Sequence, residues 1–277
     1  MKFSLCSWTF GDLPLEDVIS LAAKTGYDEV EVSAAVEAHD WSEVKKKTEQ
    51  EGIVIRGINA DANFLRPETN LANNDQKLRQ QAIDYFKHQL DVGEYLGSEY
   101  MVLAPAAPGH LIPFLPDGGD WLNAVDSIKQ LASYSEDYGI NMVIEPLNRY
   151  ENCLVYNANT AKQFLKDVNA PNVKTMLDTF HMNIEEANFI DPFKKLEGMI
   201  ETVHVADSNR RGLGEGHIPF DQVIQGIKNI GYDKTITLEC LVPNEHPFLP
   251  IDQQDIDLMY QYAKDSLHFL KNILNKR

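Results

Sequence analysis

The sequence predicts an α/β protein folded as a single (β/α)8 TIM barrel, and three observations support this prediction. The chain has 277 residues, close to the roughly 250 that one such barrel needs. Short apolar or β-branched runs alternate with segments of helical periodicity. Eight such alternations can be counted, and eight parallel strands close a barrel. We see no linker or tandem repeat, so we expect one domain over residues 1–277.

The predicted strands are short runs dominated by β-branched and apolar residues. In chain order they are Phe3–Ser7, Glu29–Val32, Val54–Asn59, Tyr100–Leu103, Asn141–Glu145, Val173–Asp178, Thr202–Ala206 and Thr235–Glu239. The alternative fold is an open doubly wound sheet, which should carry a glycine-rich first turn. The first predicted strand leads instead into Ser7-Trp8-Thr9-Phe10-Gly11, which favours the barrel.

Two of the segments between strands show helical periodicity most clearly. Asp75–Leu96 carries apolar residues four positions apart, and Gly97 follows as a helix-ending residue. Asp255–Lys276 places its apolar residues on one stripe with charges opposite. Pro105–Gly119 differs, since it contains four prolines and three glycines. Long irregular segments often act as lids or binding loops, and a rigid surface excursion is the alternative.

Composition and charge narrow the class of protein. Hydrophobic residues make up 43% and charged residues 24%, as in ordinary globular proteins. A net charge of -17 without a long basic run argues against nucleic-acid and membrane-surface partners. No apolar run approaches the ~20 residues of a membrane span, and Asp12 interrupts any apolar core of a signal peptide. Three scattered cysteines fit a reducing compartment, so we expect a cytoplasmic protein.

Ionisable side chains stand at the ends of the last four predicted strands. They are Glu145, Asp178, His204 and Glu239. The C-terminal ends of barrel strands form the active-site rim, and neighbouring strands lie about 4.8 Å apart. Three carboxylates packed this closely repel one another unless a cation lies between them. Three oxygen donors with one imidazole suit Mn²⁺, Mg²⁺ or Co²⁺ better than a structural zinc.

Each of these residues also has an ordinary explanation when taken alone. Glu145 could form a salt bridge with Arg149, and Asp178 could cap the turn that begins at Thr179. His204 alternates with valines and could be a core histidine. Only the four residues together favour a metal site.

Four segments carry a resemblance to a known family. They read IEPLNRYE, LDTFHM, HVADSNRRGLGEGHIPF and TLEC, in that order along the chain. They resemble the sugar isomerase/epimerase superfamily with the xylose-isomerase-like barrel. Within it the chain looks most like the ketose 3-epimerases of the D-tagatose and D-psicose 3-epimerase group. The resemblance covers nearly the whole chain.

The resemblance implies a role for each ionisable residue at the strand ends. Glu145, Asp178, His204 and Glu239 would bind one divalent ion, usually Mn²⁺, with Mg²⁺, Co²⁺ or Zn²⁺ as alternatives. Glu145 and Glu239 would also be the catalytic acid/base pair on opposite faces of the substrate.

The resemblance also implies residues that contact the substrate. His181 and Arg210 would hold substrate oxygens, and Glu151 would support the site through hydrogen bonds. Independently of the family, Trp8 lies at the predicted mouth of the barrel, where it could stack on a sugar or simply pack at the rim.

The implied activity is C3 epimerisation of a free ketose through a cis-enediolate, with the two glutamates as acid and base. Asp207 departs from the pattern, since many ketose 3-epimerases have a glutamate there, and this leaves the substrate open. A dehydratase or lyase acting on a cyclic polyol, of the inosose dehydratase type, would use the same ligands. An aldose–ketose isomerase and a sugar-binding protein without activity are further alternatives. A further alternative is an endonuclease of the apurinic-site type, which has the same barrel. Such an enzyme would need histidines at the ends of strands two to four to hold zinc ions, and this sequence has none there. The family also implies a possible homo-oligomer.

Overall fold

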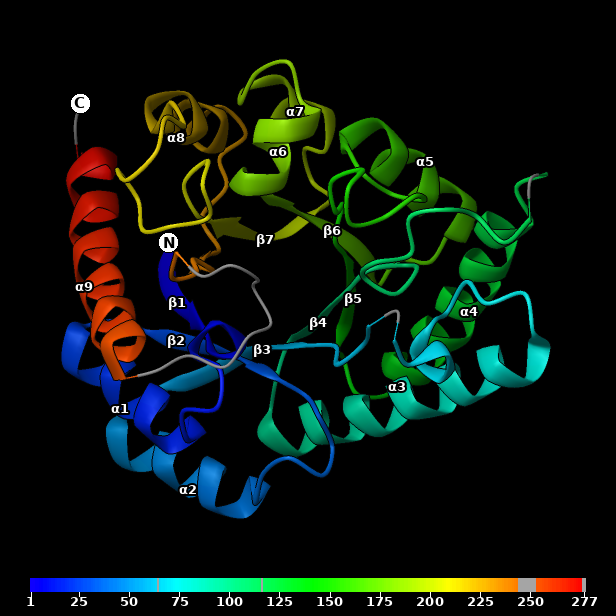
Figure 1. Cartoon of the computed structure of the whole chain (residues 1–277), viewed down its shortest axis with the longest axis horizontal. Helices are drawn as coiled ribbons and strands as arrows, with labels where there is room; N and C mark the ends of the chain where they lie inside the picture. The colour runs from blue at the N-terminus through cyan, green and yellow to red at the C-terminus, as the bar shows by residue number, and fades with distance from the viewer. Residues whose placement is uncertain (64, 116, 244–252, 276–277) are drawn as a thin grey trace.

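Eight parallel strands form a closed barrel in the computed structural model, which describes residues 1–63, 65–115, 117–243 and 253–275 (Figure 1). Each strand pairs with its neighbours in the chain, and β8 (Thr235–Leu238) closes the barrel on β1 (Lys2–Cys6). The predicted (β/α)8 barrel is therefore confirmed. The remaining strands are β2 (Glu29–Ser33), β3 (Val54–Asn59), β4 (Tyr100–Leu103), β5 (Asn141–Ile144), β6 (Val173–Asp178) and β7 (Ile200–Val205).

The predicted strand ends agree with the observed ones to within two residues. The largest difference is at β7, which begins at Ile200 rather than at Thr202. Glu145 and Glu239, predicted as the last residues of their strands, each lie one position beyond the strand end. Both residues therefore stand on the C-terminal rim, where the chain leaves the barrel wall.

Helices surround the barrel on its outside (Figure 1). Asp75 caps α3 (Gln76–Leu96) by accepting hydrogen bonds from the backbone N–H groups of Lys77 and Leu78, and Gly97 ends the helix in the left-handed conformation. The C-terminal helix predicted at Asp255–Lys276 is present as α9 (Gln253–Asn275), and its predicted last residue, Lys276, lies outside the described residues. The helices and 3-10 segments are η1 (Ser7–Phe10), α1 (Leu15–Thr25), α2 (Trp41–Glu51), η2 (Pro67–Thr69), α3 (Gln76–Leu96), α4 (Gly119–Glu136), α5 (Ala158–Val168), α6 (Thr179–Glu185), α7 (Asp191–Lys195), α8 (Phe220–Asn229) and α9 (Gln253–Asn275).

Two apolar clusters lie on the two faces of the barrel wall. On β4, Met101 and Leu103 belong to the large cluster between the strands and the helices. Tyr100 and Val102 alternate with them and form a smaller cluster with residues of β5 and β6. Because alternate residues of a strand point to opposite faces, the smaller cluster fills the interior of the barrel. No helix in the described part of the chain is long and apolar enough to cross a membrane.

The irregular segment predicted at Pro105–Gly119 is anchored at its middle, and its residue Pro116 lies outside the described positions. The His110 ring is buried and lies 2.7 Å from the Asn70 side chain through Nδ1 and 3.2 Å from Asp120 through Nε2. The backbone carbonyl of His110 accepts a hydrogen bond from the N–H of Cys153, and Gly109 donates to the carbonyl of Glu151. The segment therefore packs against the loop that follows β5.

Candidate active site

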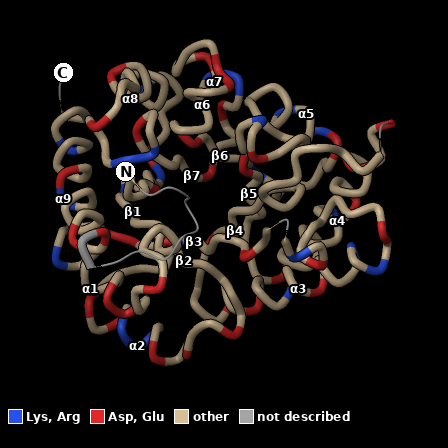
Figure 2. Tube along the Cα trace, in the orientation of Figure 1, with Lys and Arg blue, Asp and Glu red and all other residues tan. Residues whose placement is uncertain are grey.

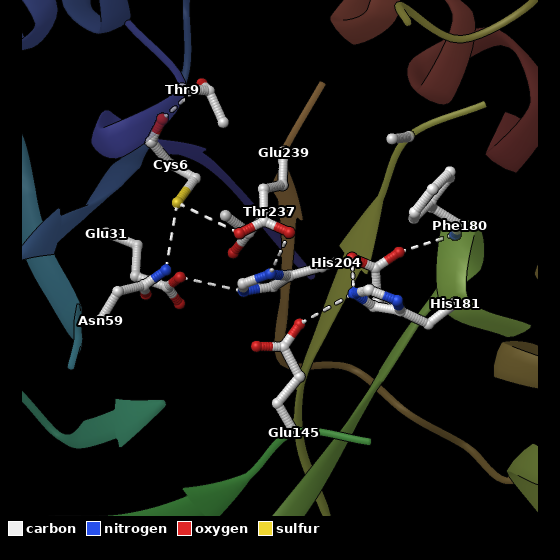
Figure 3. A network of polar contacts seen from close by, with 12 residues as sticks. Cys6, Thr9, Glu31, Asn59, Glu145, Phe180, His181, His204, Thr237 and Glu239 are labelled. Atoms are coloured by element: carbon white, nitrogen blue, oxygen red, sulfur yellow. Dashed lines mark hydrogen bonds and ion pairs between the residues drawn. The ribbon is translucent and has the colours of Figure 1, made fainter. Parts of the chain in front are cut away.

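Four ionisable side chains converge at the C-terminal rim, as the sequence predicted. Figure 3 labels three of them, Glu145, His204 and Glu239. One possible ligand atom from each of the four lies within 4.8 Å of the others. We call them the rim cluster; its members are Glu145, Asp178, His204 and Glu239. They lie in or directly after four adjacent strands, β5 to β8, so the closed barrel brings residues together that are far apart in sequence.

The rim cluster fits a divalent cation. One oxygen of Asp178 accepts the backbone N–H of Phe180 at 2.6 Å, so the residue does cap its turn. Its other oxygen, Oδ2, is buried without a hydrogen-bond partner among the described residues, and so is Nδ1 of His204. Buried polar atoms without partners are rare, and a cation would satisfy these two. Three carboxylates and one imidazole form the oxygen-rich donor set expected for such an ion.

Glu145 does not form the salt bridge considered for it. Arg149 instead binds Glu185, with Nε and Nη2 at 2.8 and 2.7 Å from the two carboxylate oxygens. The basic side chain beside Glu145 is His181, whose Nε2 lies 3.7 Å from Oε1. Glu145 is therefore a partly buried acid directed toward the rim cluster rather than toward a surface cation.

The His204 ring lies between two carboxylates. Its Nε2 is 2.9 Å from Oε1 of Glu31, and its Nδ1 is 3.3 Å from Oε2 of Glu239. His204 and Glu31 are both fully buried. Sequence reasoning missed Glu31, because it considered only residues at strand ends. The signal was the alternation Glu-Val-Glu-Val in β2, which places Glu29 and Glu31 on one face of a strand of the barrel wall.

The two rim glutamates have pKa values shifted in opposite directions. Burial raises the pKa of Glu145 well above its usual range, and the charge of Glu239 adds to this. Burial alone would raise the pKa of Glu239 too, but the positive charges of His204 and Arg210 outweigh it and hold the pKa well below its usual range. Pairs of acids whose surroundings separate their pKa values are typical of acid/base sites.

His181 presents a neutral ring to the site. Burial lowers its pKa to about 4, and its side chain is 2% exposed. Nδ1 accepts hydrogen bonds from the backbone and side-chain amides of Asn148 at 3.2 and 2.9 Å. The ring proton must therefore be on Nε2, which has no hydrogen-bond partner in the described part of the chain and lies near carboxylates of the rim cluster. His181 can thus donate to an oxygen of a bound molecule.

Arg210 is held over the site in a strained conformation. Its φ of 60° is in the left-handed region, which non-glycine residues adopt at a cost. One end of its guanidinium lies 3.3 Å from Glu239, and the other lies 3.6 Å from Glu151. Burial would lower the pKa of Arg210, but nearby carboxylates, Glu239 foremost, raise it further above its usual range. Arg210 therefore remains a cation beside the rim cluster.

Trp8 contacts a carboxylate of the rim cluster directly. Its indole N–H donates a hydrogen bond to Oε1 of Glu239 at 2.6 Å. The Arg210 guanidinium lies over the Trp8 ring at 5.6 Å from its centroid. Glu151 accepts a hydrogen bond from the side chain of Asn148 at 2.8 Å, so Asn148 links Glu151 to His181. The residues predicted to contact substrate therefore surround the rim cluster.

Asp207 stands where many ketose 3-epimerases have a glutamate, and it organises the loop after β7. It is buried and accepts backbone N–H groups of Ser208, Gly214 and Ile218 at 2.7 to 3.1 Å. Its carboxylate is therefore engaged by the backbone of its own loop and supports the turn that carries Arg210.

The chain belongs to the xylose isomerase-like TIM barrel family, which matches residues 19–272. It is 32% identical over 233 residues to a D-psicose 3-epimerase of Agrobacterium fabrum, covering 81% of this chain and 78% of the relative. It is 24% identical over 254 residues to a fructoselysine 3-epimerase of Escherichia coli O157:H7, covering 87% and 90%.

Solved structures show the same likeness. A D-psicose 3-epimerase determined in the presence of D-fructose matches with a TM-score of 0.86 and 26% identity over 99% of both chains. The enzyme from Clostridium cellulolyticum H10 with D-tagatose has the same fold, with a TM-score of 0.87 and 24% identity over 99% of both chains. These relatives are sugar 3-epimerases, which are isomerases, so the predicted family and enzyme class are confirmed.

Proposed function

We propose that the protein is a divalent-metal-dependent 3-epimerase acting on a free ketose. The observation that carries the proposal is the pair Glu145 and Glu239, which meet at one candidate metal site with oppositely shifted pKa values. In Figure 3 the two side chains enter the site from opposite sides of His204. Inversion of a carbon centre needs an acid and a base on opposite faces, and this pair supplies them.

The rim cluster would hold the metal, which when bound supplies an electrophile that acidifies the C–H beside a carbonyl. One rim glutamate removes the proton from C3, and the other delivers a proton to the opposite face. One proton leaves and one returns, so the product is the C3 epimer. Arg210 and the Nε2–H of His181 stabilise the negative charge of the cis-enediolate between the two transfers.

The choice of a free sugar over a sugar phosphate rests on the basic residues near the mouth. Arg66 lies 2.6 Å from Asp61, and Arg210 already contacts Glu239 and Glu151. Most Lys and Arg residues lie along the outer helices in Figure 2. A phosphate group would therefore have to compete with carboxylates for both of these arginines.

The test is product analysis with the Mn²⁺-loaded protein. D-Fructose, D-tagatose and the corresponding ketose phosphates are incubated with wild type, Glu145→Gln and Glu239→Gln, and products are separated by chromatography. We expect C3 epimers of the free ketoses from wild type only. Exclusive turnover of the phosphates would overturn the choice of substrate, and formation of an aldose or a dehydrated product would overturn the reaction type.

A further inference from the structure

We propose that Glu31 is a positioning residue for the metal site. It accepts the Nε2 proton of His204 and thereby leaves Nδ1 of the same ring with a free lone pair for the cation. The inference rests on the proposed function insofar as a metal binds the rim cluster. It assigns a role to a residue inside the barrel, away from the strand ends where the ligands stand.

The first argument is the geometry around His204. Nε2 lies 2.9 Å from Oε1 of Glu31 as an ion pair, and in the described part of the chain neither atom has a hydrogen-bond partner. Nδ1 faces the opposite way, 3.3 Å from Glu239 in the rim cluster. A neutral imidazole carries one proton, and a metal ligand must present a lone pair. With the ion on the Nδ1 side, the proton is on Nε2, where the carboxylate of Glu31 lies.

The second argument is that Glu31 is itself held in place. The hydroxyl of Tyr100 donates a hydrogen bond to Oε2 of Glu31 at 2.7 Å, which leaves Oε1 for His204. Both residues are fully buried, so neither carboxylate oxygen can turn toward water. A buried carboxylate is costly unless its oxygens are paired, so this arrangement indicates that Glu31 is retained for its contacts.

The barrel wall is shaped to allow the Tyr100 contact. In the strand register, Gly57 of β3 is the partner of both Glu31 on β2 and Tyr100 on β4. A Cβ atom at Gly57 would overlap the ring of Tyr100. The ring can therefore cross β3 and reach Glu31 only because position 57 has no side chain. Three adjacent strands thus contribute to one chain of contacts that ends at His204.

Glu29 provides a matched control within the same strand. It is also a buried glutamate, two residues before Glu31, but it contacts Arg56 at 2.9 Å and Thr235 at 2.7 Å. Neither partner belongs to the rim cluster. Removing the charge of Glu29 should therefore affect stability alone, whereas removing that of Glu31 should affect the metal.

The test is Mn²⁺ binding measured by calorimetry, with thermal unfolding in EDTA recorded for every variant. We expect Glu31→Gln to weaken Mn²⁺ binding by roughly 10- to 100-fold, as is typical when the partner of a metal-bound histidine is removed. Glu29→Gln should keep the wild-type affinity even if it unfolds at a lower temperature. Tyr100→Phe should weaken binding in the same direction but by less, because Glu31 remains.

A second readout follows the ring itself. Nitrogen NMR of the Zn²⁺-loaded protein should place the His204 proton on Nε2 in wild type. In Glu31→Gln this resonance should change, because a carboxamide is a weaker acceptor and can also donate.

The possible failures are distinguishable. If wild type binds no metal, the proposed function itself fails. If wild type binds Mn²⁺ and Glu31→Gln binds it equally well, only the role of Glu31 is overturned. Should Glu31→Gln not fold, Tyr100→Phe carries the test, and an unchanged affinity in that variant contradicts the proposal.

Discussion

Replacing the two rim glutamates one at a time should change the stability of the metal-free protein in opposite directions. Glu145 binds its proton more tightly in the folded chain than in the unfolded chain, because burial and Glu239 raise its pKa. Its ionisation therefore costs stability as pH rises above the ordinary carboxyl pKa. Glu239 has a lowered pKa, so its ionisation stabilises the fold, and this contribution is lost as pH falls.

The distances in the rim cluster set the expected size for Glu145→Gln. The ligand atoms of the rim cluster lie within 4.8 Å of one another, and two like charges at that upper limit repel by ~3.5 kcal/mol with an effective dielectric constant of about 20. Part of this repulsion is already avoided when Glu145 is protonated. We therefore expect Glu145→Gln to stabilise the metal-free protein by about 1–3 kcal/mol at pH 7, which is roughly 2–6 °C in Tm. The gain should disappear below about pH 3.5, well under the ordinary glutamate pKa of about 4.3, where wild-type Glu145 is neutral in both states.

Glu239→Gln should have the opposite effect. The substitution removes the carboxylate that His204 and Arg210 face, and it weakens the hydrogen bond from Trp8. Breaking a buried pair by removing one partner typically costs about 3–5 kcal/mol. The Tm of the metal-free variant should therefore fall by roughly 6–10 °C or more.

The assay is thermal unfolding of the three proteins in EDTA and then with excess Mn²⁺. An ion present at 100 times its dissociation constant stabilises the fold by ~2.7 kcal/mol, or roughly 5 °C in Tm. Wild type should show this increase, and both variants should lose most of it. If both variants shift Tm in the same direction in EDTA, the reasoning about their charges is refuted. If either variant keeps the full response to Mn²⁺, that residue is not a ligand.

Three further predictions concern other parts of the molecule. Burial lowers the pKa of His110 despite Asp120 beside it, so stability should fall as pH decreases below about 6.5. His110→Gln should flatten this dependence in urea unfolding at pH 5 and 7, and an equally steep dependence would contradict it. Gly57→Ala should lose about 1–3 kcal/mol because its Cβ overlaps Tyr100; an unchanged denaturation midpoint would count against the packing described. Arg210→Lys should lower kcat by roughly 10²–10³ while Mn²⁺ affinity is kept, and a normal kcat would exclude Arg210 from charge stabilisation.

The fold was predictable because its pattern is local and repeated. Each strand is a short apolar run, and each helix has its own periodicity and, as at Asp75 and Gly97, its own end signals. Four metal-site candidates could be found for a related reason. Once the strands are placed, barrel geometry brings their C-terminal ends to one rim. Glu145 and His204 could therefore be assigned to the same site without knowing which side chains contact each other.

The contacts that orient these residues were not predictable. In β2 the alternation of glutamate and valine shows that the two faces differ, but not which face points into the barrel. The partners of Glu31 lie on β4 and β7, far away in the sequence. Trp8 was expected to stack on a sugar or to pack at the rim, whereas its indole N–H binds Glu239, 231 positions away. Such pairs depend on side-chain directions that only the folded barrel fixes.

The most direct test of the central claim is the transfer of solvent deuterium to C3 of a free ketose. D-Fructose is incubated in D₂O with Mn²⁺-loaded wild type, with the EDTA-treated protein and with Glu145→Gln, and C3 deuterium is followed by NMR. The account predicts deuterium at C3 with wild type only, accompanied by the C3 epimer. Exchange that persists without metal, or an absence of exchange with every free ketose while the metal is bound, would contradict it.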